Sequence, residues 1–325
     1  MMTNKTTSKF ANELNIGVSA CLLGKPVRFD GGHKKNGFIL DTLSPHVNMI
    51  SVCPEAEAGL GIPRPAMHLR QTGTGLLLLG SKNPDNDFTV RLEGFAEKRL
   101  PDLAQLDGFI FKKDSPSCGV FRVPVVVNEQ GHRNRTGRGI FATAFSEHYP
   151  LIPIEEEGRL NDAGLRENFF ERVYAYRRWK AIQNPLSNVQ GFIKFHARHK
   201  LMLMARGSHF YQELGRMVAG TKVSDLEQRR EAYIQRFMEV MAYMPRHGRH
   251  VNVLQHIMGY IKTHLSSLDK QELLSSFEAY RQRQVPLITP VTLLKHYLRI
   301  YPDEYISSQH YLSPVPEHLA LRSWI

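Results

Sequence analysis

The chain of 325 residues contains three cysteines, Cys21, Cys53 and Cys118. Each lies at or just beyond the carboxyl end of a short apolar run, in a turn that contains Gly or Pro. In open α/β sheets, ligands bind at the carboxyl ends of the strands. A free cysteine is ordinarily a small buried apolar side chain, and that remains the alternative for each. All three cysteines follow the carboxyl ends of predicted strands, and this common position favours a shared chemical role.

The spacing of the cysteines limits the chemistry that they could support. They are 32 and 65 residues apart, which matches no zinc-finger pattern, and the chain has no Cys-x-x-Cys pair for dithiol redox chemistry. Three thiolates brought together from separate strands could hold a soft metal centre. A four-iron cluster usually takes four cysteine ligands, so three would leave one iron open to substrate, as Lewis-acid catalysis requires.

The first half of the chain has the pattern of an α/β domain. Helical stretches between apolar runs favour a mostly parallel, Rossmann-like sheet with crossover helices over residues 1–160. The runs that predict strands are Ile16–Ala20, Val47–Val52, Gly75–Leu79, Gly108–Phe111 and Val123–Val127. Because parallel strands end at the same edge, such a sheet would bring the three cysteines together.

The second half has the pattern of capped helices. Residues 161–187 predict a connecting helix and a linker with a break at Asn184-Pro185, and residues 188–325 predict an all-α domain. A helix is expected over Phe192–Val218. A capping box at Ser224–Glu227 predicts the start of the next helix, which should end before Pro245.

Charge divides the chain in the same way. Of a net charge of +11, residues 1–160 carry 19 basic and 17 acidic side chains, a net of +2, and residues 161–325 carry 23 and 14, a net of +9. A polyanion such as RNA is the natural partner of a basic half, although a basic surface can simply be solvated. The candidate RNA contacts are Lys194, Arg198, Arg246 and Arg249. No RNA-recognition, KH or helix-turn-helix signature accompanies them.

Composition excludes several classes of protein. With 42% apolar and 22% charged residues, the chain has material for a core and is not globally disordered. No apolar run approaches the ~20 residues of a membrane helix, and the first residues lack the apolar region of a signal peptide. The sequence therefore predicts a soluble cytoplasmic protein, with no membrane association and no obligate protein partner.

Five motifs, taken in order, resemble the thiouracil desulfidase family over about residues 15–160. They are Gly17–Gly24 (GVSACLLG), Val27–Gly32 (VRFDGG), Val52–Glu55 (VCPE), Gly61–Pro65 (GIPRP) and Ser115–Gly119 (SPSCG). The part from Phe192 to about Pro302 resembles a second helical family, formerly uncharacterised. The fused arrangement is similar to bacterial desulfidases that act on 4-thiouridine in RNA.

The resemblance implies a [4Fe–4S] cluster held by Cys21, Cys53 and Cys118, with one iron not ligated by a protein cysteine. It also implies that Glu55 and Ser115 are catalytic. Glu55 beside a cluster ligand could deprotonate water, and Ser115 could orient the substrate or relay a proton. The alternatives are an exposed loop carboxylate for Glu55 and turn chemistry for Ser115.

Two further residues of these motifs are weaker candidates. Asp30 could contact substrate or serve only as a turn residue, and Ser117 could donate its hydroxyl to a cluster sulfur or to the substrate. The predicted function is removal of sulfur from 4-thiouridine in tRNA or in thiolated nucleotides, giving uridine and hydrogen sulfide. The alternatives are a desulfidase of free thiouracil bases, a cluster-dependent hydratase, and a non-catalytic RNA-binding protein that senses iron or oxidation.

Overall fold

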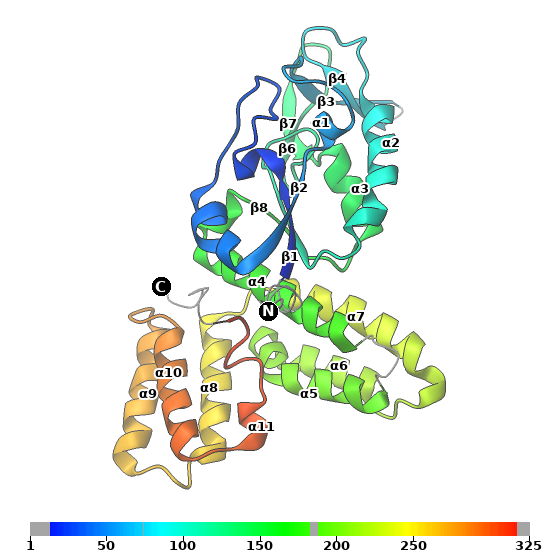
Figure 1. Cartoon of the computed structure of the whole chain (residues 1–325). Coiled ribbons are helices and arrows are strands. Elements are labelled where there is room, and N and C mark those ends of the chain that lie inside the picture. Colours follow the sequence, from blue (N-terminus) through cyan, green and yellow to red (C-terminus); the bar gives the residue numbers. More distant parts are fainter. Residues whose placement is uncertain (1–13, 74, 183–187, 317–325) are drawn as a thin grey trace, which may run out of the picture. The chain divides into compact units, whose positions relative to one another are not determined.

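A computed structural model describes residues 14–73, 75–182 and 188–316 (Figure 1). The chain divides into two compact units, residues 1–162 and 163–325. The prediction of an α/β domain followed by an all-helical region is confirmed. The first 13 residues of the predicted α/β domain and the predicted linker at 183–187 lie outside the described residues.

The first unit contains two four-stranded sheets. The strands are β1 (Leu14–Ser19), β2 (Val47–Val52), β3 (Met67–Thr72), β4 (Gly75–Gly80), β5 (Gly108–Phe111), β6 (Val123–Val126), β7 (Arg133–Gly137) and β8 (Ile154–Glu156). One sheet has the order β2-β1-β5-β8 and is entirely parallel. The other has the order β4-β3-β6-β7, with only β3 and β6 parallel.

All five predicted strands are present, and three strands were missed. The predicted strands are apolar, and β5 is buried throughout, as expected for a central parallel strand. The missed strands lack that signal: β3 and β7 are largely polar, and β8 has three residues, two of them glutamates. Edge and half-exposed strands therefore escaped a prediction based on apolar runs.

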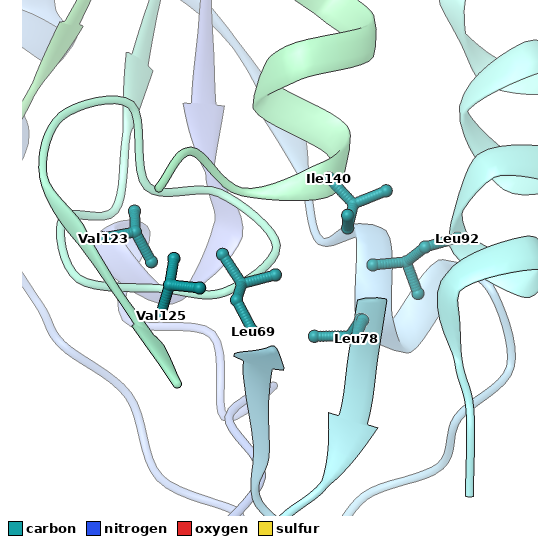
Figure 2. Close-up of a cluster of buried hydrophobic side chains, with 6 residues drawn as sticks. All are labelled: Leu69, Leu78, Leu92, Val123, Val125 and Ile140. Atoms are coloured by element: carbon teal, nitrogen blue, oxygen red, sulfur yellow. The ribbon is translucent and has the colours of Figure 1, made fainter. Parts of the chain in front are cut away.

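Helices cover the sheets and connect their strands. In the first unit they are α1 (Pro54–Glu57), α2 (Thr89–Arg99) and α3 (Ile140–His148), with shorter turns η2 (Ala20–Leu23), η3 (Phe38–Leu43), η4 (Ser44–His46), η5 (Leu100–Leu103) and η6 (Arg159–Asn161). Figure 2 shows Leu92 of α2 and Ile140 of α3 packed against Leu69 and Leu78 of the mixed sheet. Complete burial of such an aliphatic side chain contributes about 1.5–3 kcal/mol.

The second unit is helical. Its helices are α4 (Ala163–Ile182), α5 (Val189–Arg206), α6 (Ser208–Val218), α7 (Leu226–Ala242), α8 (His247–Ile261), α9 (Ser267–Arg281), α10 (Ile288–Ile300) and α11 (Glu304–Ser307), with a short turn η7 (Val223–Asp225) before α7. Helix α4 packs against α7 and α5, so it belongs to this unit. No described helix is both long and apolar enough to cross a membrane.

Two local predictions in this unit were wrong. The single helix expected over Phe192–Val218 is broken at Gly207, whose φ of 156° lies outside the helical region and separates α5 from α6. The capping box expected at Ser224–Glu227 is also shifted. Asp225 instead accepts a hydrogen bond from the backbone N–H of Lys222 at 2.7 Å, before α7. Both errors arise because helical periodicity and capping-box motifs are read from residue types, which do not report backbone torsion angles.

Candidate active site

The three cysteines lie at the carboxyl ends of three adjacent parallel strands. Cys21 is in η2 directly after β1, Cys53 precedes α1 directly after β2, and Cys118 is in the turn that follows β5. Because the strand order is β2-β1-β5, the three turns are neighbours. All three cysteines line one cavity of about 400 Å³. The expectation that they meet at one edge of the sheet is confirmed.

The thiols are buried and influence one another. The pKa of Cys21 rises to about 11, because the thiol is largely buried and Cys53 lies beside it, while Lys112 and Arg28 act in the opposite direction. Burial also raises the pKa of Cys53, and it raises that of Cys118 well above the ordinary value. Buried thiols of this kind become thiolates when a metal cation supplies the compensating charge.

The donor set therefore fits a thiolate-bound metal centre. Within residues 14–73, 75–182 and 188–316, no three His, Cys, Asp or Glu side chains are grouped tightly enough to hold a single metal ion. The thiols are distributed around the cavity instead. Sulfur ligands select soft centres, including iron–sulfur clusters, over hard oxygen-liganded cations.

Glu55 faces the same cavity and is held at both carboxylate oxygens. The Nε and Nη2 atoms of Arg64 donate to Oε2 at 2.8 and 2.5 Å, and the hydroxyl of Ser117 donates to Oε1 at 2.8 Å. The Arg64 side chain is 4% exposed and that of Glu55 is 14% exposed. Glu55 is thus a fixed, largely buried carboxylate, and the alternative of an exposed loop residue is not what the structure shows.

Arg64 also connects the loops around the cavity. Its Nη2 donates to the carbonyl of Val27 at 2.9 Å, and its backbone N–H donates to the carbonyl of Phe29 at 2.9 Å. Farther along this loop, the N–H of Lys34 donates to the carbonyl of Cys21 at 2.9 Å. These hydrogen bonds therefore hold the segment between Cys21 and Lys34 to Arg64 and to the turn that carries Cys21. Sequence reasoning assigned no role to Arg64, although it lies in the quoted GIPRP motif.

Ser115 and Ser117 shape the turn that carries Cys118. The Oγ of Ser115 accepts the backbone N–H groups of Ser117 at 3.2 Å and of Cys118 at 3.0 Å, which is the turn chemistry given as its alternative role. Ser115 also lines the cavity, so its own hydroxyl hydrogen can donate there. Ser117 is fully buried, and its hydroxyl donates to Glu55 rather than to a substrate group.

The start of helix α3 is hydrogen-bonded to the turn that carries Cys118. The N–H of Ile140 donates to the carbonyl of Pro116 at 3.2 Å, and the N–H of Phe141 donates to the carbonyl of Ser117 at 3.0 Å. The close approach depends on Gly139, because a Cβ there would lie 2.5 Å from the carbonyl carbon and oxygen of Ser117 and 2.7 Å from the nitrogen of Cys118. The chain thus needs a glycine where the start of α3 meets the cysteine turn.

The structure places Asp30 in a turn, outside the residues that line the cavity. Its Oδ1 accepts the N–H of Gly32 at 3.0 Å and pairs with Arg28 at 3.4 Å. The hydrogen bond from Gly32 is the first cause of its lowered pKa. These contacts correspond to the turn role that was the alternative to substrate contact.

Several cationic side chains line the cavity, and sequence reasoning missed them. Arg28 and Lys34 come from the loop after η2, and Lys112 and Lys113 directly follow β5. Lys112 forms an ion pair with Glu157, whereas Lys34 is exposed. The Lys112-Lys113 pair after a predicted strand was the available signal, because that position is where substrate-binding residues of an α/β sheet are expected.

The four predicted RNA contacts in the second unit differ in exposure. Lys194 and Arg198 are exposed on α5, and Arg246 is exposed at the residue before α8. Arg249 is half-buried and donates to the backbone carbonyl of Arg206. Arg249 lies within the first turn of α8 and has an internal partner, so it is the weakest of the four candidates.

His196 and His199 are core residues of the helical unit. Both are buried; the Nδ1 atom of His196 lies 3.1 Å from the hydroxyl of Tyr233, and that of His199 lies 2.7 Å from the carbonyl of Phe195. Burial lowers the pKa of His196 to about 4 and that of His199 well below the ordinary value. Both rings are therefore neutral at physiological pH and do not add to the basic surface.

Comparison with known proteins agrees with this division into two units. A sequence model of the 2-thiouracil desulfurase family matches residues 16–157, and a model described as a protein of unknown function (DUF1722) matches residues 200–316. The uncharacterized protein YbgA of Escherichia coli (strain K12) is 32% identical over 152 residues, which are 46% of this chain and 90% of YbgA. The solved structure of the [4Fe-4S]-dependent thiouracil desulfidase TudS is 30% identical, with a TM-score of 0.38, and covers 46% of this chain and 95% of that one. The chain therefore contains a domain that matches the 2-thiouracil desulfurase family at residues 16–157, joined to a DUF1722 domain at residues 200–316.

Proposed function

We propose that this chain is a [4Fe–4S]-dependent desulfidase that removes sulfur from 4-thiouridine in tRNA or in thiolated nucleotides. The products are uridine and hydrogen sulfide, without net redox change. One observation carries the proposal: Cys21, Cys53 and Cys118 line a single cavity within the domain that matches the 2-thiouracil desulfurase family. Both 2-thiouracil and 4-thiouridine present a thiocarbonyl group on a pyrimidine ring.

The three thiols are the residues that would hold the cluster. They are one fewer than the four cysteines that a closed [4Fe–4S] site takes, so one iron would lack a cysteine ligand. When bound, the cluster supplies an iron position that a soft thiocarbonyl sulfur prefers. Burial and the neighbouring Cys53 raise the pKa of Cys21, and Lys112 and Arg28 offset only part of that rise, so the thiolate form depends on the charge of a bound metal.

We assign proton transfer to Glu55. A guanidinium can only donate hydrogen bonds, so the Oε2 atom that accepts two of them from Arg64 is occupied as an acceptor. The other oxygen, Oε1, faces the hydroxyl of Ser117. Oε1 is therefore the atom that takes a proton from the attacking water, and Arg64 and Ser117 hold it in position.

The overall reaction consumes one water and needs no electron donor. The water oxygen forms a bond to C4 of the pyrimidine, the bond between C4 and sulfur breaks, and both water protons leave with the sulfur as hydrogen sulfide. Glu55 carries the first of these protons. The Ser115 Oγ already accepts two backbone N–H groups, so its hydrogen serves to orient a pyrimidine oxygen or nitrogen.

One cation of the lining supports a phosphate-bearing substrate over a free base. Arg28, Lys112 and Lys113 form ion pairs with Asp30, Glu157 and Asp114, whereas Lys34 lines the cavity and is exposed, so it suits a phosphate that an uncharged base lacks. The net charge of +9 on residues 161–325 supports a longer polyanion. The 2-thiouracil desulfurase family match favours the free base as the second candidate.

Salt dependence distinguishes these substrates. If the exposed cations on α5 contact the RNA backbone, affinity for thiolated tRNA should fall roughly tenfold between about 50 and 200 mM salt for about two neutralised phosphates. The double variant Lys194→Ala/Arg198→Ala should reduce the salt slope by roughly two, because each lost phosphate contact removes about one unit. Steady-state sulfide release from tRNA and from free 4-thiouracil, at both salt concentrations, provides the measurement.

The salt-dependence measurement, together with reconstitution of the cluster, distinguishes the alternative functions. Free 4-thiouracil should show almost no salt dependence, and it serves as the internal control. Equal salt responses for the two substrates would mean that the basic half does not hold RNA. A protein that stays colourless after anaerobic reconstitution yet binds RNA would instead favour a non-catalytic RNA-binding role.

Gly139→Ala tests the support of the cysteine turn. A Cβ at this position overlaps the backbone at Ser117 and Cys118, so we expect a loss of about 1–3 kcal/mol in stability and a lower iron content per chain. Gly94→Ala in α2 is the matched control, because a Cβ there has no neighbour within 4 Å. Iron content after reconstitution and the melting temperature are measured for both. Equal iron content and equal melting temperature in the two variants would show that Gly139 does not support the turn that carries Cys118.

A further inference from the structure

A second cavity, of about 190 Å³, lies entirely within the helical unit. It is lined by residues of α4, of the first turn of α8 and of α9, and by the segment between α9 and α10. The segment that carries two of the predicted RNA contacts, Arg246 and Arg249, contributes Pro245, His247 and His250 to its wall. This cavity is smaller than the roughly 300–1,000 Å³ of sites for drug-sized ligands, so it suits a single planar ring system.

One wall of the cavity is aromatic. The rings of His247 and Tyr280 stack, with centroids 5.0 Å apart and planes at 29°, and the ring of His250 meets Tyr280 edge-on at 6.0 Å. The Nδ1 atom of His250 lies 2.8 Å from the hydroxyl of Tyr311, which fixes the orientation of that ring. Burial, followed by the nearby Arg283, lowers the pKa of His247, so this ring is neutral and suited to stacking.

The polar part of the lining comes from α4 and is already ordered. The side-chain amide of Asn168 donates to the carbonyl of Met241 at 3.0 Å, so its orientation is set. Glu171 is neutralised by the buried guanidinium of Arg206 at 2.9 Å. Glu167 adds a further carboxylate to the wall. The Asn168 amide and the Glu167 carboxylate can read the edge of an uncharged ring, and Glu167 disfavours an anionic group inside the cavity.

Two exposed arginines belong to the cavity wall or adjoin it in the sequence. Arg283 lines it and is exposed, and Arg246 is exposed one residue before His247. Single-stranded RNA is recognised by this combination: an unstacked base on aromatic rings, polar groups at its edge, and cations for the adjoining phosphates.

From this arrangement, we infer that the second cavity binds one unstacked nucleobase of an RNA chain, and that Arg283 and Arg246 contact its flanking phosphates. The inference rests on the proposed action on RNA and adds a second, non-reacting base site to it. His247 is the stacking residue, and Arg283 is the phosphate contact.

Binding of a fluorescently labelled oligouridylate to the full-length protein tests this site without any need for turnover. His247→Ala should weaken binding about 5- to 150-fold, the range for loss of one stacked base, with an unchanged salt slope. His247→Phe keeps a ring and should restore most of the affinity. Arg283→Gln should weaken binding and reduce the salt slope by about one, because it removes a phosphate contact.

The matched control is His296→Ala, an exposed histidine of α10 that does not line the cavity, and it should bind like wild type. Desulfuration of free 4-thiouracil, measured in parallel, should be the same in all variants. If wild type desulfurates neither thiolated tRNA nor free 4-thiouracil while His247→Ala still loses RNA affinity, the proposed activity fails and the base site stands. If His247→Ala and His247→Phe both bind the oligouridylate as tightly as wild type, the base site is overturned.

Discussion

Serine in place of Cys21, Cys53 or Cys118 should in each case abolish both iron–sulfur binding and sulfide release. The three thiols line one cavity, and the chain has no fourth cysteine that could replace a lost ligand. A serine hydroxyl is a hard ligand that stays protonated at neutral pH, so it does not substitute for a thiolate. Iron and sulfide content, visible absorption after anaerobic reconstitution, and turnover of 4-thiouracil are the measurements.

Serine is nearly the same size as cysteine, so the apo fold should survive each substitution. Melting temperatures of the apo variants close to that of the apo wild type would show this. Full activity in any one variant would remove that cysteine from the cluster. Loss of activity with a complete four-iron spectrum would assign that cysteine to substrate contact instead.

Glu55→Gln should leave the cluster absorption intact and lower the turnover number by about 10²-fold or more, the usual loss when an acid–base group is removed. Glutamine can still accept from Arg64 through its oxygen while its NH2 group donates to the hydroxyl oxygen of Ser117, but the amide cannot take the proton of the attacking water. The KM for the small substrate should change much less than the turnover number, because the side chain keeps its size and position. Steady-state kinetics on reconstituted protein checks both quantities.

Glu97→Gln is the matched control, because it makes the same chemical change at an exposed position of α2 outside the cavity. It should behave like wild type. An unchanged turnover number for Glu55→Gln would move proton transfer to another group. Simultaneous loss of the cluster would show that Glu55 supports the adjoining Cys53 turn instead.

The position of Glu55 shows why sequence reasoning found only part of the site. Cys53 and Glu55 are neighbours in one short motif, so their proximity could be predicted. The contact between Ser117 and Glu55 joins residues 62 positions apart, and the role of Arg64 depends on loops that close around the cavity. Hydrogen bonds between residues this far apart in the sequence have no local signal, because they depend on which strands become neighbours.

Asp30 and Arg249 are candidates for which the structure shows internal partners. Both were singled out because their residue type and local motif suited binding. In the fold, Asp30 closes its own turn with Gly32, and Arg249 donates to a backbone carbonyl of a neighbouring helix. A charged side chain in a promising motif can be satisfied internally, and only the three-dimensional partners reveal it.

By itself, the sequence determined that the chain has an α/β part and a helical part, and that each cysteine follows the end of a strand. These features depend on apolar periodicity and turn residues, which act over a few neighbouring positions. Only the tertiary structure decided that β2, β1 and β5 are adjacent, that Arg64 and Ser117 hold Glu55, and that a second cavity forms beside α8. The physical reason is that strand order and helix packing minimise the free energy of the whole chain, so contacts between distant residues are not encoded in any local segment.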